Sequence, residues 1–236
     1  MERLLKIEMH AHSKGGSGCA SASPEDIASE FKSQGYDGLV LTNHICESEF
    51  NKYPGDTKKE KLDFYFSLYE DVRSACEKLG LKVFYGTEVR AKHDGFIEFM
   101  LYGFEKEFLY NAPLLFTLTQ KELFELCERE GVLMYQTHPF RRGVCLGDPK
   151  YMHGAEYFNG HVNHINNNAD ARKFIDENNL LKTCGTDYHD PGQPLTAYAL
   201  IPESINTNKQ LADYIRLGNL QIFGDEEKYV SLCRKK

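Results

Sequence analysis

The sequence contains no run that approaches the ~20 consecutive apolar residues needed by a membrane-spanning helix. Its first residues, MERLLKIEMH, contain no apolar segment followed by a small-residue cleavage site, so we expect no signal peptide. These two absences predict a cytoplasmic protein that has no membrane partner.

The sequence also has no Cys-x-x-Cys pair. Its seven cysteines are scattered from position 19 to position 233, and an odd number cannot all pair with one another. This pattern argues against a zinc ribbon and gives no indication of a disulfide framework. We therefore expect most of the cysteines to be small buried residues in a reducing compartment.

Positive charge is in deficit as well. The 236 residues include 28 Lys and Arg against 35 Asp and Glu, which gives a formal net charge of −7. Binding to a phosphate backbone needs clustered positive charge, so we expect no general nucleic-acid binding. Hydrophobic residues make up 41% and charged residues 27%, which excludes a collagen-like, coiled-coil or disordered chain. A single α/β barrel domain can occupy the whole of 1–236.

Short apolar runs alternate with amphipathic segments along the chain. Residues 38–42, GLVLT, are apolar throughout, as in a buried parallel strand, and residues 23–26, SPED, are typical of a helix start. Strands are predicted at 4–9, 38–42, 81–85, 98–102, 132–136, 154–158, 180–184 and 196–201. Helices are predicted at 24–34, 58–79, 120–130, 169–178 and 208–217. This alternation favours a parallel sheet.

Histidines and acidic residues gather where the predicted strands end: His10, His12, His44, Glu88, His138, Asp187 and His189. The carboxyl ends of barrel strands converge on one face, so these residues are expected to share one pocket. His10 and His12 are two residues apart, which puts both imidazoles on the same side of a strand, about 7 Å apart along the chain. Imidazole and carboxylate ligands together favour Zn, Mn or Fe over Ca or Mg.

Taken together, these residues resemble the PHP (polymerase and histidinol phosphatase) family. The segments that carry the resemblance are spread over most of the chain: EMHAHS, YDGLVLTNH, GTE, THPFR, EYFNG and GTDYH. The resemblance implies a distorted seven-stranded β/α barrel of the TIM-like kind that holds two or three metal ions. It also implies that the reaction is phosphoester hydrolysis.

The resemblance further implies a set of metal ligands. Four residues resemble the ligands of a first ion: His10, His12, Glu88 and Asp187. Glu88 is expected to bridge to a second ion, which also takes His138. Glu98 stands where the family often has a histidine, and a carboxylate can replace that ligand.

His44 and His189 resemble ligands of a third ion. The family normally supplies an Asp or His shortly after His-x-His, where this sequence has Ser17, Gly18 and Cys19. The third site is therefore expected to be empty, weakly held or completed by Cys19.

Two further positions are expected to support the ligands. Glu8 and Asn43 stand where the family has aspartates, and we interpret both as residues that hold ligands in place.

The predicted reaction is hydrolysis of a small phosphomonoester, such as histidinol phosphate or a nucleotide, by a metal-activated hydroxide. Arg141 and Arg142 directly follow His-Pro-Phe and are predicted to bind phosphate oxygens through their planar guanidinium groups. Ser13 and His44 are additional candidates for substrate binding.

Three residues are predicted to act in catalysis: Asp187, His189 and Arg141. The acid that protonates the leaving group stays open among Asp187, His189 and His44. Four other histidines fall in predicted loops and are interpreted as polar surface residues: His93, His153, His161 and His164. Two of them, His161 and His164, are also candidates for the mouth of the pocket.

Two other classes of function stay open. Amidohydrolases and nucleoside deaminases also use a barrel with His-x-His on its first strand. They commonly bridge their metals with a modified lysine, however, and no lysine is suitably placed here. The second alternative is a catalytically degraded, metal-binding accessory domain of the kind that the family attaches to DNA polymerases. The oligomeric state is left open by the sequence.

Overall fold

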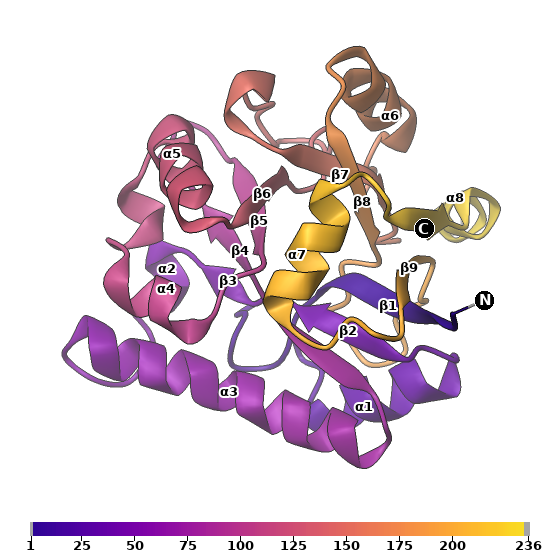
Figure 1. Cartoon of the computed structure of the whole chain (residues 1–236), viewed down its shortest axis with the longest axis horizontal. Helices are drawn as coiled ribbons and strands as arrows, with labels where there is room; N and C mark the ends of the chain where they lie inside the picture. The colour runs from indigo at the N-terminus through magenta and orange to yellow at the C-terminus, as the bar shows by residue number, and fades with distance from the viewer. Residues whose placement is uncertain (1, 234–236) are drawn as a thin grey trace.

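The chain folds around one mixed sheet (Figure 1). The computed structural model describes residues 2–233, within which ten strands form a sheet in the order β10-β9-β1-β2-β4-β5-β6-β7-β8, with β3 beside β4. The strands are β1 (Leu4–Ala11), β2 (Gly38–Leu41), β3 (His44–Ile45), β4 (Lys82–Arg90), β5 (Glu98–Tyr102), β6 (Leu133–Gln136), β7 (Gly154–Asn159), β8 (Leu181–Gly185), β9 (Ala197–Pro202) and β10 (Gln221–Gly224).

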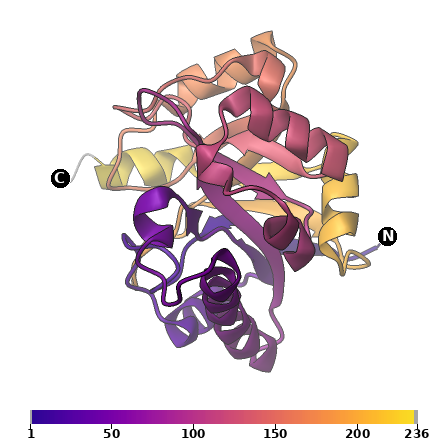
Figure 2. The ribbon, with the colours of Figure 1, turned by 90° about the vertical axis from the view of Figure 1, so that its left-hand side faces the viewer.

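Eight α-helices are found in the same residues: α1 (Pro24–Ser33), α2 (Glu47–Phe50), α3 (Lys58–Lys78), α4 (Lys106–Asn111), α5 (Gln120–Glu130), α6 (Asn168–Glu177), α7 (Asn208–Arg216) and α8 (Glu226–Cys233). In Figure 1, α3 runs along the lower edge with α4 above it, α5 lies at the upper left, and α6 and α8 lie at the upper right and right. Figure 2 shows the same arrangement turned by 90°. No helix among residues 2–233 is both long enough and apolar enough to cross a bilayer.

Seven strands form a nearly closed barrel. The run from β1 through β2, β4, β5, β6 and β7 to β8 returns to its start, because the segment after β8 pairs with the end of β1. The N–H of Tyr188 donates to the carbonyl of His10 (3.1 Å), and the N–H of His12 donates to the carbonyl of Tyr188 (2.8 Å). Strands β9 and β10 extend the sheet from the first half of β1. The predicted distorted seven-stranded α/β barrel is confirmed.

The prediction of a parallel sheet is wrong at β9, which runs antiparallel to β1 and β10, and it is wrong at β5. This strand runs antiparallel to both β4 and β6, and Arg90 at the end of β4 lies directly opposite Glu98 at the start of β5. Because β5 is reversed, its first residue lies at the rim where β4 ends. The reversal therefore brings Glu98, at the start of its strand, to the rim. The sequence pattern had predicted that the rim is formed by residues at the ends of parallel strands.

Local signals explain why the predicted helices agree with the structure to within one residue at each end. Four helices begin with a capping box, in which two side chains three residues apart hold each other's backbone N–H: Ser23 and Asp26, Thr57 and Glu60, Thr119 and Glu122, Thr207 and Gln210. Helix α5 ends at Gly131, whose φ of +72° is a left-handed conformation that glycine adopts without strain.

Five short elements were not predicted from the sequence: β3, α2, α4, β10 and α8. Each has eight residues or fewer, which is too short for a clear periodicity. Strand β4 is also longer than predicted and reaches Arg90, so Glu88 lies within the strand and not after it.

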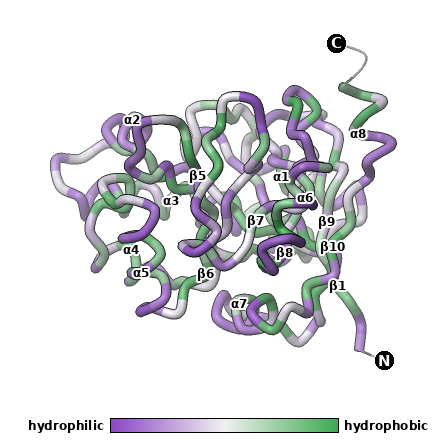
Figure 3. Tube along the Cα trace, turned by 90° about the horizontal axis from the view of Figure 1, so that it is seen from above, coloured by the Kyte–Doolittle hydropathy of each residue, from purple (hydrophilic) through white to green (hydrophobic). Residues whose placement is uncertain are grey.

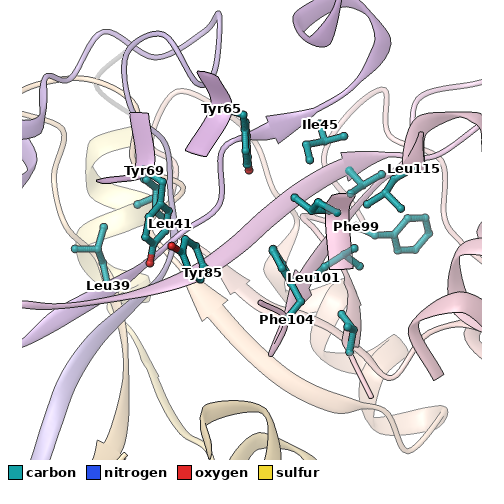
Figure 4. Close-up of a cluster of buried hydrophobic side chains, with 14 of the residues drawn as sticks. Leu39, Leu41, Ile45, Tyr65, Tyr69, Tyr85, Phe99, Leu101, Phe104 and Leu115 are labelled. Carbon is teal, nitrogen blue, oxygen red and sulfur yellow. The ribbon is translucent and has the colours of Figure 1, made fainter. Parts of the chain in front are cut away.

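Apolar contacts fix the strands against the helices. In Figure 4, Leu41 of β2 and Tyr85 of β4 lie with Tyr69 of α3, and the rings of Tyr69 and Tyr85 are 3.9 Å apart between centroids. A second apolar cluster joins the strands to Leu211 and Ile215 of α7. Hydrophilic and hydrophobic residues alternate along α7 in Figure 3, as expected for a helix with one buried side. Burial of each apolar side chain of this size contributes about 2 kcal/mol to the free energy of unfolding.

Candidate metal centre

The predicted residues meet at the rim of the barrel, around a cavity of about 580 Å³. Eight of them line this cavity: His44, Glu88, Glu98, His138, Arg141, Arg142, Asp187 and His189. His10 and His12 lie behind the lining and are wholly buried. A second cavity of the same volume lies between α4, α5 and α7, and none of the predicted residues lines it.

Four donor atoms form a first group. The Nε2 atoms of His10 and His12 are 2.9 Å apart, and each lies 3.4 to 3.5 Å from Oε2 of Glu88 and from Oδ1 of Asp187. A tetrahedral ion with bonds of about 2.1 Å separates its ligands by about 3.4 Å. These four atoms therefore fit one divalent cation.

Glu88 extends the centre to a second group. Its Oε1 atom is buried without a hydrogen bond and lies 3.2 Å from Nε2 of His138. Oε2 of Glu98 is 3.7 Å from the same nitrogen. A buried carboxylate oxygen without a donor is costly unless a cation satisfies it. Glu88, His138 and Glu98 thus fit a second cation, with Glu88 placed between the two groups.

Three imidazoles form a third group. His12, His44 and His189 each bring one nitrogen within 4.8 Å of the other two. The thiol of Cys19 lies 3.4 Å from Nε2 of His44. Burial and nearby carboxylates raise the pKa of the Cys19 thiol to about 12, so without a cation it stays protonated. This group shares His12 with the first, so an ion held here would compete with the first ion for that ligand.

Neighbouring side chains fix the orientation of His10 and His12. Nδ1 of His10 lies 2.7 Å from Oε1 of Glu156, and Nδ1 of His12 lies 2.9 Å from Oγ of Ser17. Glu8 accepts the backbone N–H of His10 (2.9 Å), in agreement with its expected supporting role. Since Nδ1 of each ring is occupied, Nε2 is left for the centre.

Sequence reasoning missed the role of Glu156. This residue of β7 is wholly buried, and its Oε2 atom accepts the backbone N–H of His138 (2.6 Å) and the amide N–H of Asn159 (2.9 Å). One carboxylate therefore holds His10 of the first group and His138 of the second. One signal in the sequence could have indicated this role. Glu156 lies inside a strand predicted to be buried, and Glu is almost never fully buried without partners.

The backbone of two ligand candidates is in the left-handed region. His138 has a φ of +30° and Asp187 a φ of +53°, conformations that cost non-glycine residues of order 1 kcal/mol. Just before Asp187, a Cβ atom at Gly185 would lie 2.3 Å from Cβ of His10. Only glycine thus lets β8 approach β1 closely enough to bring Asp187 to His10.

The centre has an excess of negative charge. Five carboxylates are buried at the centre: Glu8, Glu88, Glu98, Glu156 and Asp187. Among residues 2–233, two arginines contact them, Arg90 and Arg141. With neutral histidines this leaves three negative charges, and two divalent ions would make the site +1. Burial and the charge of Glu88 raise the pKa of Glu98 to about 8, which is the expected effect of crowded carboxylates without a cation.

Two of the buried carboxylates, Asp187 and Glu98, are each held by an arginine. Nη2 of Arg141 donates to Oδ2 of Asp187 (2.5 Å), and Nε and Nη2 of Arg90 donate to Oε1 of Glu98 (3.1 and 2.9 Å). Each carboxylate keeps its second oxygen for the histidines of the centre. Arg90 was not predicted, because its contact depends on the antiparallel register of β4 and β5.

Asp187 is better suited to be a ligand than a proton donor. Burial alone would favour its neutral form, but His10 and Arg141 hold the pKa of the carboxyl well below its usual range. The group is therefore ionised at neutral pH. This removes Asp187 from the candidates for the acid and leaves His189 and His44, both of which line the cavity.

The structure does not place Ser13 in the cavity. Its side chain is buried, its hydroxyl accepts a hydrogen bond from Nδ2 of Asn43 (2.9 Å), and its N–H donates to Oδ1 of Asn43 (2.8 Å). The prediction that Ser13 binds substrate is thus not supported, whereas the supporting role expected of Asn43 agrees with these contacts. Arg142 is exposed and lines the cavity, as a substrate-binding residue requires.

Two of the four remaining histidines differ from the prediction. His161 is only 5% exposed and lines the cavity, and His153 is largely buried against Glu128 and β6. Both were interpreted as polar surface residues because loops are usually solvated, although a place at the mouth of the pocket had been left open for His161. His164 is exposed at the rim of the cavity, and His93 is exposed outside its lining, as expected.

Comparisons with known proteins place the fold. Scans of the sequence against family models and against curated proteins find no match. The structure is similar to PsfC from Pseudomonas syringae PB-5123, with a TM-score of 0.70 and 16% identity over 99% of this chain and 97% of that one. It is also similar to a two-domain protein from Bacteroides vulgatus ATCC 8482 that contains a predicted PHP-like metal-dependent phosphoesterase, with a TM-score of 0.64 and 20% identity over 100% and 70% of the two chains.

A third similar structure is the lesion-specific endonuclease PfuEndoQ from Pyrococcus furiosus. The TM-score is 0.58 at 16% identity, over 93% of this chain and 58% of the endonuclease. At these identities the comparisons establish a shared fold. The chain thus has the barrel fold of PHP-like phosphoesterases.

Proposed function

We propose that this protein is a metal-dependent phosphoesterase that hydrolyses a small phosphomonoester. The observation that carries the proposal is the position of Glu88, whose two oxygens face two separate groups of ligand atoms at the floor of a cavity. Two divalent cations held side by side by such a carboxylate would stabilise the attacking and the leaving oxygen of a phosphoryl displacement.

The proposed centre takes two divalent ions, with Zn, Mn or Fe favoured by the mixed imidazole and carboxylate ligands. The first ion would be held by His10, His12, Glu88 and Asp187, and the second by Glu88, His138 and Glu98. A third ion at His44 and His189 is part of the proposal only as a weak site. When bound, such ions act as Lewis acids on phosphoryl oxygens and lower the pKa of water.

The protein's own cations would bind the phosphate group. Arg141 is fixed beside the centre by Asp187, Asn159 and Asn166, and the hydrogen bonds of its guanidinium group use Nε and Nη2. Its Nη1 group has no partner among residues 2–233 and is left for a phosphate oxygen. Arg142, on the exposed side of the same wall, would add a second contact.

His189 is the proposed donor to the leaving oxygen. Its Nδ1–H donates to the carbonyl oxygen of Asp187 (2.8 Å), so the proton that would pass to the leaving oxygen is the one on Nε2 of the doubly protonated ring. His44, the other candidate, is 3.2 Å from Oε2 of Glu88 through Nδ1 and is therefore nearer the ligands than the mouth. A cavity of about 580 Å³ fits a small molecule such as histidinol phosphate or a nucleotide.

Two observations favour this function over the alternatives. No lysine is among the residues that line the cavity, so the modified lysine common in amidohydrolases has no counterpart within residues 2–233. A degraded accessory domain would be expected to lose ligand positions, but His10, His12, Glu88, His138 and Asp187 are all oriented towards one another.

The test is a substrate panel with metal-depleted protein reloaded with Mn²⁺, Zn²⁺ or Fe²⁺. The panel contains an aryl phosphate, histidinol phosphate, nucleoside monophosphates, a lactone, an amide and a short DNA oligonucleotide. We expect metal-dependent release of inorganic phosphate from a monoester. Turnover of the lactone or amide alone would favour the amidohydrolase class, cleavage of DNA alone would favour a nuclease, and bound metal without any turnover would favour the accessory domain.

A further inference from the structure

His161 occupies a position on the cavity wall that the proposed chemistry does not yet use. It follows β7, is only 5% exposed, and lines the cavity together with Arg141 and His189. The centroid of its ring lies 5.3 Å from that of His189 and 4.6 Å from that of His164. The ring of His161 thus faces the cavity in which a substrate would bind, beside the candidate metal ligands.

A local hydrogen bond fixes which ring nitrogen carries the proton. Nδ1 of His161 accepts the backbone N–H of Asn163 (3.2 Å), so this nitrogen must be unprotonated. The proton of the neutral imidazole is therefore on Nε2. No partner for this N–H is found among residues 2–233, and the atom belongs to a residue that lines the cavity. His161 thus offers an unused N–H to whatever occupies the cavity.

The hydrogen bond from Asn163 also fixes the charge of the ring. Because Nδ1 accepts, the ring is neutral and donates only through its Nε2–H.

The same amide positions His161 and Arg141. Oδ1 of Asn159 accepts Nη2–H of Arg141 (2.9 Å) and the backbone N–H of His161 (3.1 Å). Asn166 donates to the same oxygen (3.0 Å) and to the carbonyl of His161 (3.3 Å). Two donors to the cavity, one cationic and one neutral, are thereby held in a fixed relation without using their free N–H groups.

We propose that His161 is a substrate-binding residue that donates its Nε2–H to a phosphoryl oxygen held at the same time by Arg141. This inference rests on the proposed phosphoesterase function and assigns one more contact to its substrate. A neutral donor beside a fixed guanidinium group suits a phosphate monoester, which has several acceptor oxygens on one atom.

The test uses two substitutions that separate the two ring nitrogens. Asparagine places an acceptor near the position of Nδ1 and has no donor near Nε2. Glutamine places an N–H near the position of Nε2. If His161 acts on substrate, H161Q retains function and H161N loses it. If the ring only supports the loop through Asn163, the order is reversed.

The measurements are the dissociation constant of inorganic phosphate by calorimetry and the KM and kcat for an aryl phosphate, all on Mn²⁺-loaded protein of verified metal content. We expect H161N and H161L to weaken phosphate binding about tenfold, the usual effect of removing a hydrogen bond to a charged group, and H161Q to recover most of this loss. The matched control is H93N with H93L, because Nδ1 of His93 also accepts the N–H of the residue two positions later, Gly95 (2.9 Å), but His93 is exposed outside the cavity lining.

Different outcomes would contradict the role of His161 and the phosphoesterase function on which it rests. Wild-type affinity in H161N, or equal losses in H161Q and H161L, would overturn the role of His161 while leaving the phosphoesterase function intact. A wild-type protein that takes up metal but neither binds phosphate nor hydrolyses any monoester would overturn both.

Discussion

The carboxylate of Glu156 holds the imidazole of His10 from behind, with 2.7 Å between Oε1 and Nδ1, and both side chains are completely buried. The two residues are 146 positions apart in the sequence. This contact keeps the proton of His10 on Nδ1 and directs Nε2 towards Glu88 and Asp187. The affinity of the centre for its first ion should therefore depend on a residue that never touches the ion.

Replacement of Glu156 by glutamine tests this dependence. E156Q should lower metal affinity by about 10- to 100-fold, the range typical of carboxylates behind ligating histidines. The measurement is a competition titration with a chelating dye on metal-depleted protein. The control is E128Q, since Glu128 also pairs with a histidine, His153 (2.5 Å), at a place away from the cavity. Equal affinities of E156Q and wild type would contradict the proposed role.

Glu88 and Glu98 should differ in how many ions they retain. Glu88 has one oxygen towards each group of ligands, so E88Q should lose tight binding of both ions and all detectable phosphatase activity. The measurement is the metal content after dialysis, by elemental analysis, together with turnover of an aryl phosphate. Retention of two tightly bound ions by E88Q would rule out a bridging position.

Glu98 belongs to the second group of ligand atoms, where it lies beside His138, and it is not one of the four donors of the first group. E98Q should therefore keep one ion per chain and lose the second, because the four donors of the first group are unchanged. The same elemental analysis distinguishes this result from that of E88Q. A stoichiometry of two in E98Q would show that the second ion does not need this carboxylate.

Arg141 should affect both substrate binding and the geometry of Asp187. R141M should lower kcat/KM for a phosphomonoester by about 10- to 100-fold, because hydrogen bonds to charged groups contribute about 1.5–3 kcal/mol. R141K keeps the charge without the planar fork and should recover part of the loss. The control is R172M, which removes an arginine of α6 that pairs with Glu226 (2.9 Å) and does not line the cavity. Unchanged kcat/KM in R141M would remove Arg141 from the site.

His153 should make the metal-free protein less stable in acid. Burial lowers the pKa of this histidine although Glu128 opposes the shift, and its Nδ1 atom accepts the backbone N–H of Met134 (3.0 Å). Below pH ~6.5 the unfolded chain takes up a proton that the folded protein does not, so the free energy of unfolding falls with falling pH, by at most about 1.4 kcal/mol per pH unit for this group.

The substitution H153N keeps an acceptor near the position of Nδ1 and removes the titration. Its unfolding free energy, from urea titrations of metal-free protein at pH 7.5, 6.5 and 5.0, should be lower than that of wild type at pH 7.5 but should decline less in acid. Parallel pH curves for the two proteins would exclude His153 as a source of the acid sensitivity.

The sequence predicted those parts of the protein that depend on nearby residues. Capping boxes such as Thr119 with Glu122 define helix starts within three residues, and the predicted helices agree closely with the structure. His10 and His12 share one side of a strand because of the period of two, and they do contribute adjacent Nε2 atoms. The barrel itself was predicted with its seven strands, on a resemblance in motifs at strand ends.

Long-range pairing was beyond the sequence pattern. A reversed β5 is not distinguishable from a parallel strand by hydrophobicity, so the position of Glu98 at the rim and its contact with Arg90 were set by the register with β4. Glu156 and His161 gave only weak signals for a similar reason, because their roles depend on partners in β1 and in the loop after β6.

The amino-acid sequence by itself thus determined which side chains are available to bind cations and where the five longer helices begin and end, because these properties follow from residue chemistry and contacts a few positions apart. Only the tertiary structure decided which oxygen or nitrogen of each side chain faces the centre. That choice depends on partners such as Glu156, Arg90 and Asn159, which chain folding brings in from distant strands and whose hydrogen bonds leave one atom of each ligand free.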